Sequence, residues 1–240
     1  MKDVKLDKQT QYSINYFTKT DTLKLVGGGV LIAGLFALWI GWGLVGFILA
    51  FLGVPVGFVL FFIGSTGRVN DEHMDTYINN KMAGLEIDID TNRSYQLRLL
   101  KNSKDITIEG YHFHDEVMIK KLKDGSLRSS EFSRSKIRML KDALYIVNRE
   151  ISLIYNENVQ NNLYEISYDS ILSIEAVREQ KKMEFNKNIY NVKHCTLIIN
   201  CKDKILKLPC ADALTSEELV SDIEHKIKQW HESVQNNQTK

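Results

Sequence analysis

The sequence predicts an α+β protein with two unlike parts: a two-helix transmembrane hairpin, followed by an antiparallel β-barrel or sandwich that a C-terminal helix caps. Three observations lead to this prediction. The stretch from Leu25 to Gly67 contains no Asp, Glu, Lys, Arg or His over 43 residues. Short β-rich runs, separated by turn residues, follow from Asp105 to Pro209. An amphipathic helical stripe lies near the C-terminus.

The apolar stretch is long enough for two membrane crossings. One crossing takes about 20 residues as helix, and a single helix of the whole stretch would measure roughly 65 Å, about twice the hydrocarbon thickness. We therefore expect helices over 21–40 and 44–63, a turn at Gly41-Trp42-Gly43, and Pro55 inside the second helix. The stretch is too long for a secretory signal peptide, and it is apolar on all sides, unlike a helix in the core of a soluble protein.

Small residues recur at helical spacing in both predicted helices, and they let helix backbones approach closely in lipid. The predicted packing seam comprises Gly29, Ala33, Ala37 and Gly41 in the first helix, and Gly46, Ala50, Gly53 and Gly57 in the second. Two interpretations stay open: the seam packs the two helices of one hairpin, or it also packs neighbouring copies into an oligomer. A conduction path within one copy is not expected, because such paths need polar groups at depth.

Flanking charge predicts the orientation. Five lysines precede the hairpin, whereas Arg68 and Lys81 follow it and the turn carries no charge. The positive-inside rule then places both termini in the cytoplasm of a multi-pass protein of the cell membrane, with the lipid bilayer as a partner. Three scattered cysteines agree with a reducing compartment.

The sequence divides into four segments. We expect a cytoplasmic tail over 1–22, the transmembrane hairpin over 23–64, a juxtamembrane connector over 65–104, and a cytosolic β-rich domain over 105–236. The connector contains a predicted helix at 72–83 that closes near Gly84.

Turn residues and periodicity order the β-rich domain. Asp124-Gly125, Lys141-Asp142 and Arg149-Glu150 are predicted hairpin turns, and about seven strands are expected between Ser135 and Pro209. Thr215 and Glu218 form a predicted capping box for the last helix. The apolar stripe of that helix consists of Leu219, Ile223, Ile227, Trp230 and Val234.

The segment ISYDSI and the following ILSIE mark a recognisable progression of strands. The residues that carry it are Ile166, Tyr168, Asp169, Ile171, Ile174 and Glu175. With seven strands and a capping helix, the region from Ser135 to Trp230 resembles the bacterial PH-like (PH/GRAM-type) domain. The resemblance implies a non-enzymatic interaction module. The family's basic lipid-binding motif has no counterpart here, because Lys141-Asp142-Ala143 is too short a turn to hold a phosphoinositide.

Charge is distributed unevenly along the β-rich domain. The run from Glu116 to Lys141 has eight basic and three acidic residues, whereas Glu150 to Glu175 has five acidic and no basic residues. The candidate surface for membrane or partner binding comprises Lys120, Lys121, Lys123, Arg128, Arg134, Lys136 and Arg138. Two other interpretations stay open: the opposite charges pair within the domain, or a basic face of one copy contacts an acidic face of another.

Metal and catalytic signals are weak. His112 and His114 alternate, so on a strand they would share a face and could ligate a metal with Asp115 or Glu116. His194 and Cys195, with Cys201, form a second weak set. The sequence contains no phosphate loop and no nucleophile motif, so we expect neither a cofactor nor an enzyme.

Two functions from different classes follow. The first is a membrane-anchored interaction module that binds a protein partner or the inner membrane surface. The alternative is an oligomeric membrane effector or channel-like assembly that its cytosolic domain regulates. Nucleic acid is not an expected partner, because 31 basic residues face 30 acidic ones.

Overall fold

The structure is a computed structural model that describes residues 8–19, 22–40, 43–66, 69–85, 98, 105–155, 159–211 and 213–238. Close contacts divide the chain into two units, Met1–Asn70 and Asp71–Lys240. The class is α+β, with helices first, antiparallel sheets next and a helix last. The division falls inside the segment 65–104, and the helix of that segment groups with the β-rich unit.

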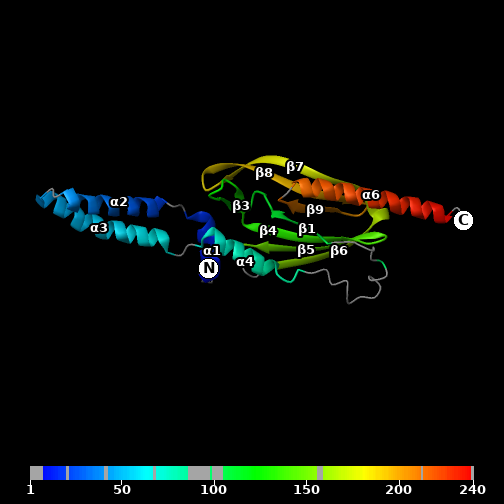
Figure 1. Cartoon of the computed structure of the whole chain (residues 1–240), viewed down its shortest axis with the longest axis horizontal. Helices are drawn as coiled ribbons and strands as arrows, with labels where there is room; N and C mark the ends of the chain where they lie inside the picture. The colour runs from blue at the N-terminus through cyan, green and yellow to red at the C-terminus, as the bar shows by residue number, and fades with distance from the viewer. Residues whose placement is uncertain are drawn as a thin grey trace, which may run out of the picture. The chain divides into compact units, whose positions relative to one another are not determined.

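The first unit contains α1 (Lys8–Thr18), α2 (Thr22–Ile40) and α3 (Gly43–Ser65) (Figure 1). α2 and α3 pack side by side as a hairpin, and α3 includes Pro55, as predicted. Gly41 and Trp42, in the predicted turn, lie outside the described residues. In the part of the chain that the structure describes, no individual helix has both the length and the hydropathy of a membrane span, although Thr10–Thr18 and Thr22–Ala37 meet those criteria together as a pair bent by 74°.

Glycines set the closest approach of α2 and α3. A Cβ added at Gly27 would lie 2.3 Å from the backbone nitrogen of Phe61, and one at Gly57 would lie 2.6 Å from that of Leu31. Gly34 meets the backbone of Val54 in the same way, at 3.1 Å. Any side chain at these positions would therefore push the two helices apart.

Three residues of the predicted seam lie at the contact between the two helices, and two lie away from it. Ala50 is buried and Gly53 lies against Gly34, so with Gly57 they form the α3 side of the contact. In α2, however, Gly29 has no neighbour within 4 Å and Ala33 is exposed. Two residues are roughly 200° of rotation on a helix, so the stripe that starts at Gly29 lies on the opposite side from Gly27. Gly41 and Gly46, also in the predicted seam, lie outside the residues whose surroundings the structure describes.

The second unit begins with α4 (Asp71–Met82) and ends with α6 (Ala213–Gln238). One sheet has the order β1-β4-β5-β6, a small one pairs β2 with β3, and the third has the order β7-β8-β9. The strands are β1 (Ile106–Tyr111), β2 (Ile119–Lys121), β3 (Leu127–Ser129), β4 (Glu131–Met139), β5 (Ala143–Ser152), β6 (Val159–Ser167), β7 (Ile171–Phe185), β8 (Asn188–Cys201) and β9 (Ile205–Cys210).

The two larger sheets pack face to face around one core (Figure 1). Ile137 and Leu144 from the four-stranded sheet share this core with Leu197 of the three-stranded sheet, and all three are fully buried. Leu219 and Ile223 of α6 enter the same cluster, as the predicted stripe requires. The described strands form separate ladders and no closed barrel, so of the two predicted arrangements only the sandwich describes them.

Three details of the prediction need correction. The pair Arg149-Glu150 lies inside β5 instead of in a turn, because both residues continue the ladders with β4 and β6. Among the described residues of 135–209, six strands are present, since β1 lies upstream. The turns at Asp124-Gly125 and Lys141-Asp142 are confirmed. α6 begins at Ala213, two residues before the predicted cap at Thr215.

α4 covers part of the outer face of the four-stranded sheet. Its buried side carries Met74, Ile78 and Met82. The guanidinium of Arg149 on β5 donates to the backbone oxygens of Lys81 and Ala83, both at 2.9 Å. A cation at this position satisfies the carbonyl groups that the end of a helix leaves without partners. Gly84, with φ of +70°, then ends the helix as predicted.

Candidate functional site

A cavity of about 850 Å³ opens between the β2–β3 hairpin and the β7–β8 ribbon. We call this cavity the hairpin groove. Its apolar lining comes from Tyr111, Phe113, Leu122, Leu127, Cys195 and Cys210. Its charged lining comes from Arg128, Arg178, Lys193 and Glu179. A concave site with an apolar floor and a few polar groups is the usual form of a binding site.

The groove forms because β7 and β8 extend beyond the end of β9. β8 pairs with β9 only from Cys195 to Asn200, whereas it pairs with β7 as far as Asn188. The ribbon turns at Asn186 and Lys187, whose φ values of 50° and 64° are those of a two-residue type I′ turn. This overhang leaves the space beside the outer part of β8 without a third strand among those described.

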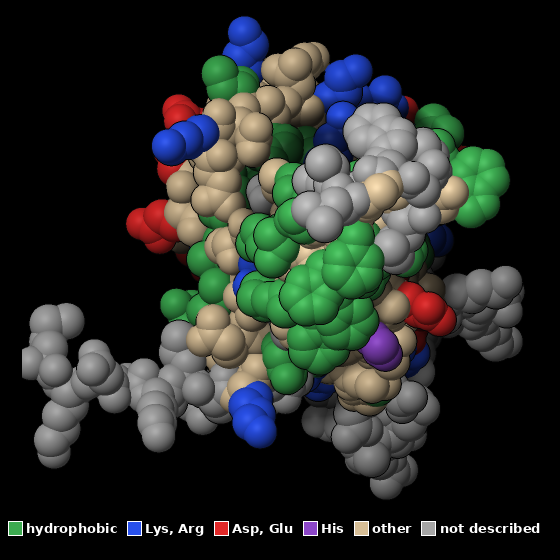
Figure 2. Space-filling model, turned by 90° about the vertical axis from the view of Figure 1, so that its left-hand side faces the viewer, with side chains coloured by type: hydrophobic (Ala, Val, Ile, Leu, Met, Phe, Trp, Pro, Cys, Tyr) green, Lys and Arg blue, Asp and Glu red, His purple; other side chains and the backbone are tan. Residues whose placement is uncertain are grey.

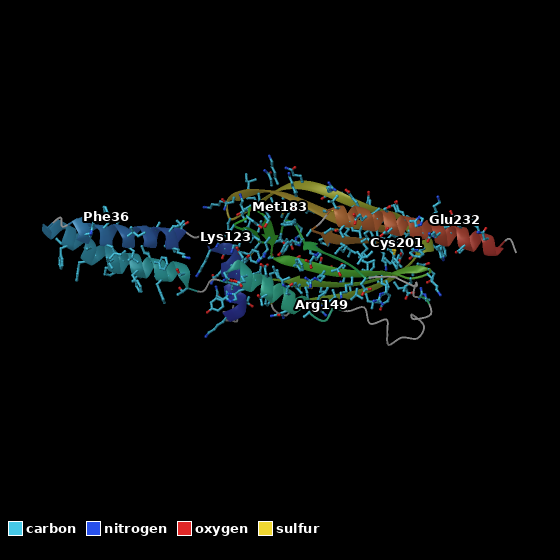
Figure 3. The ribbon with its side chains drawn as sticks, viewed as in Figure 1. Phe36, Lys123, Arg149, Met183, Cys201 and Glu232 are labelled. Atoms are coloured by element: carbon cyan, nitrogen blue, oxygen red, sulfur yellow. The ribbon has the colours of Figure 1, made fainter. Side chains whose placement is uncertain are left out.

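A second, smaller core holds the ribbon over the β2–β3 hairpin. Met183 of β7 and Val192 of β8 are buried against Val117 and Ile119. Figure 3 places Met183 on the ribbon and Lys123 beside the β2–β3 hairpin. The groove therefore lies between two packed clusters, which fix its two walls.

His194 lies in the groove wall between Glu179 of β7 and Phe113, which follows β1. Its Nε2 lies 3.3 Å from a carboxylate oxygen of Glu179, and its ring lies 6.0 Å from that of Phe113, centroid to centroid. Its Nδ1 is buried and has no hydrogen-bond partner among the described residues. Beside the ring, Lys181 on β7 pairs with Asp115 at 2.6 Å, which ties the ribbon to the segment after β1.

Arg128 joins the groove to α4. Its side chain is 4% exposed, and its guanidinium pairs with Asp75 of α4 and lies 6.0 Å from the ring centroid of Tyr111. Burial raises the pKa of Tyr111, and the nearby Arg128 opposes that rise in part. Arg128 therefore stabilises the groove wall as a paired cation, instead of standing on an open basic face.

Four of the seven residues of the predicted basic surface form ion pairs within the β-rich unit. Lys120 pairs with Asp71 at 3.4 Å, Arg134 with Glu109 at 2.5 Å, and Arg138 with Asp105 at 2.5 Å. Of the seven predicted residues, only Lys121, Lys123 and Lys136 have no carboxylate partner within the described part of the chain. Three of the seven side chains therefore keep a positive charge that no described carboxylate pairs.

The two weak metal sets are not assembled. His112 and His114 follow β1 instead of lying within it, and His114 Nε2 lies 2.9 Å from a carboxylate oxygen of Glu131. Burial lowers the pKa of His112, although Glu150 and Glu131 oppose this shift. Within the described residues, no three His, Cys, Asp or Glu side chains are arranged to hold a metal ion.

His194 and Cys195 are neighbours on β8, so their side chains point to opposite faces of the strand. Cys201 is buried at the far end of the same strand. These positions explain why the second set does not converge.

Sequence reasoning missed the groove itself. Its lining comes from four separate places: the end of β1, the β2–β3 hairpin, the β7–β8 ribbon and the end of β9. One signal was available, namely that the apolar run 205–210 is much shorter than the runs on either side of the turn at Asn186. Comparison with known proteins finds no family model, no curated protein and no solved structure that matches this chain.

Proposed function

We propose that this chain is a membrane-anchored interaction module whose β-rich unit binds a protein partner through the hairpin groove. The observation that carries the proposal is the groove: about 850 Å³, an apolar floor and a polar rim, fixed between two packed clusters. A protein partner is favoured over the inner membrane surface, because four of the seven predicted basic residues pair within the unit.

The hairpin of α2 and α3 supplies the anchor. Its two helices expose large apolar side chains, including Leu25 at 73%, Trp39 at 82% and Phe51 at 69% exposure. Figure 2 looks onto this hairpin and shows hydrophobic side chains gathered over it. Monomeric soluble proteins rarely expose so continuous an apolar surface, whereas a lipid environment stabilises it.

The order of the strands supports a PH-like relationship. A meander of β1, β4, β5 and β6 precedes a second meander of β7, β8 and β9, and α6 packs against the core between them. Seven strands in two meanders and a C-terminal helix are what the resemblance implies, with β2 and β3 as an insertion and without barrel closure. Such domains serve widely as interaction modules, which agrees with the proposed role.

The test is photo-crosslinking in membranes from cells that express the chain naturally. A photo-crosslinking amino acid replaces Leu127 in the groove or, as the matched control, Leu163, which is exposed on β6 outside it. We expect a discrete protein adduct from position 127 and none from 163. Equal labelling at both positions, adducts with lipid alone, or no adduct would each overturn binding of a protein at the groove.

A second function has one observation in its favour. Gly29 and Ala33 lie on the side of α2 that does not contact α3, so this small-residue face is open to another hairpin. An oligomeric membrane assembly would use this face. A discrete multiple of the chain mass in mild detergent, reduced to a single chain by Gly29→Leu, would support it, and a single-chain mass of the unaltered protein would remove it.

A further inference from the structure

The outer part of β8 has an edge that no described strand pairs. Antiparallel strands alternate, so every second residue directs its backbone N–H and C=O to one neighbour and the rest to the other. Cys201 N–H donates to Lys204 at the β8–β9 turn, which assigns the odd-numbered residues of β8 to the β9 side. Pro209, which has no N–H, lies opposite the even-numbered Thr196 and agrees with this assignment.

The same alternation continues beyond the end of β9. Ile189, Asn191 and Lys193 therefore direct their backbone groups away from β7, toward the line on which β9 would continue. Asn191 and Lys193 both line the hairpin groove, and so does Ala211, directly after β9. The groove thus occupies the place of a missing strand, with an open row of hydrogen-bonding groups along one wall.

We propose that the hairpin groove binds an extended, acidic peptide segment of a partner protein, which pairs with β8 as an added strand and places a large apolar side chain on the floor. This inference rests on the proposed interaction function. The outer part of β8, Asn188–His194, would match a segment of roughly seven extended residues, or about 23 Å. Main-chain pairing of this kind gives affinity, and side-chain pockets give specificity.

The charged residues at the groove indicate the charge of the peptide that it binds. The two arginines of the lining are already paired, Arg128 with Asp75 and Arg178 with Glu217. By contrast, Lys193 lines the groove, Lys182 of β7 lies opposite Asn191, and Lys123 follows Leu122 of the lining. All three are exposed, and none pairs with a carboxylate in the described ranges. Glu179 is the acidic residue of the lining and lies beside His194, so the three lysines outnumber it and favour an acidic segment. They oppose a second copy of the β7–β8 ribbon, which carries the same Lys182 and Lys193.

The floor of the groove indicates which apolar side chain the peptide carries. Tyr111, Phe113, Leu122 and Leu127 surround a space that no described side chain fills. An aromatic residue of the peptide would bury its ring there against aromatic and aliphatic neighbours. The expected sequence is therefore short, extended and acidic, with one aromatic or large aliphatic residue.

The experiment measures binding of a probe peptide to the full chain in detergent by fluorescence anisotropy. The probe is a fluorescein-labelled ten-residue peptide that alternates Glu with Thr around one central Phe. Its control replaces each Glu with Lys. We expect saturable binding of the acidic probe and at least about tenfold weaker binding of the basic one, because opposite charges attract across the groove rim.

Two variants at one position separate backbone pairing from side-chain contact. Asn191→Pro removes an N–H from the open edge while leaving the ladder with β7, whereas Asn191→Ala keeps that N–H. Because both variants lose the Asn191 side chain, we expect about tenfold weaker binding for Asn191→Pro than for Asn191→Ala. Lys193→Glu should also weaken binding about tenfold, whereas Lys207→Glu, exposed on β9 outside the groove, should not. Thermal unfolding checks that each variant is folded.

Each contrary outcome has a distinct meaning. Equal binding by Asn191→Pro and Asn191→Ala overturns strand addition, and equal binding of both probes overturns the acidic preference. A fall in the mass of the detergent-solubilised chain on Asn191→Pro would identify a second copy as the occupant and also overturn the inference. If the probe does not bind but position 127 still crosslinks to a protein in membranes, this inference fails while the proposed function stands.

Discussion

The substitution Gly110→Ala tests the junction that holds the two sheets together. Gly110 lies on β1 where that strand crosses β9, and a Cβ there would lie 2.9 Å from the backbone nitrogen of Cys210 and 2.9 Å from the carbonyl carbon of Pro209. Beside this point, Ala211 N–H donates to Glu109 O at 2.6 Å. Both neighbours are backbone atoms, so no side chain can move aside to accept the methyl group.

The magnitude follows from these distances. Contact between carbon atoms is optimal at about 3.5–4.0 Å, so β1 and β9 must separate by roughly 0.6 Å or more. Overpacking of this kind costs about 1–3 kcal/mol, and a weakened hydrogen bond from Ala211 adds about 1 kcal/mol. The loss of chain entropy in the unfolded state returns about 0.4–1 kcal/mol. We expect a net loss of about 1–3 kcal/mol, or roughly 3–10 °C in the melting temperature of a unit of this size.

The assay is thermal unfolding of the full chain in detergent, followed by the β-sheet circular dichroism signal. Thr107→Ala, an exposed change on the same strand, is the matched control and should leave the melting temperature within about 2 °C. If Gly110→Ala melts with the control, the close crossing of β1 and β9 is absent, and the packing of the sandwich described above is wrong.

Three further predictions concern the hairpin, the groove wall and pH. Gly57→Leu should separate α2 from α3 and lower the yield of folded chain in detergent. Gly29→Leu should leave the helical circular dichroism unchanged, because a Cβ at this position has no neighbour within 4 Å. Equal effects of the two substitutions would contradict the assigned contact face. Asp75→Ala should lower the free energy of unfolding by about 2–4 kcal/mol in denaturant titration, because it leaves the buried Arg128 without this partner, and the double variant with Arg128→Met should recover part of the loss. Because burial lowers the pKa of His112 in the folded state, the unfolded state binds more protons below about pH 6.5, so stability should fall as the pH decreases from there. His112→Gln should flatten that slope, and an identical slope in both proteins would refute the assignment.

The sequence was most informative where one local signal decides the structure. The bounds of α2 and α3 match the predicted helices to within two residues, because the charge-free stretch and its glycine pair leave few ways to place two helices. α4 ends as predicted because Gly84 adopts the positive φ that glycine favours. The stripe of α6 was readable from spacing alone, since Leu219 and Ile223 recur every fourth residue.

The errors arose where several local patterns compete. α2 carries small residues on two sides, so spacing alone does not select Gly27 over Gly29 as the contact face. The polar pair Arg149-Glu150 resembles a turn when the sequence is taken locally. In the structure, Arg149 donates hydrogen bonds to the end of α4, more than sixty residues earlier in the sequence.

The groove and the ion pairs depend on long-range contacts. Arg128 pairs with Asp75, which lies 53 residues earlier in the sequence. The run of basic residues, considered without this distant partner, therefore predicted an open basic surface. The groove requires the β7–β8 ribbon to fold over the β2–β3 hairpin through Met183 and Val192, which no local pattern encodes.

Alkaline carbonate extraction of native membranes measures whether α2 and α3 anchor the chain in the bilayer. We predict that the full chain stays in the membrane pellet at high pH and is released only by detergent, because lipid would cover the large apolar side chains that the hairpin exposes. Release of the chain into the carbonate supernatant would contradict the anchor.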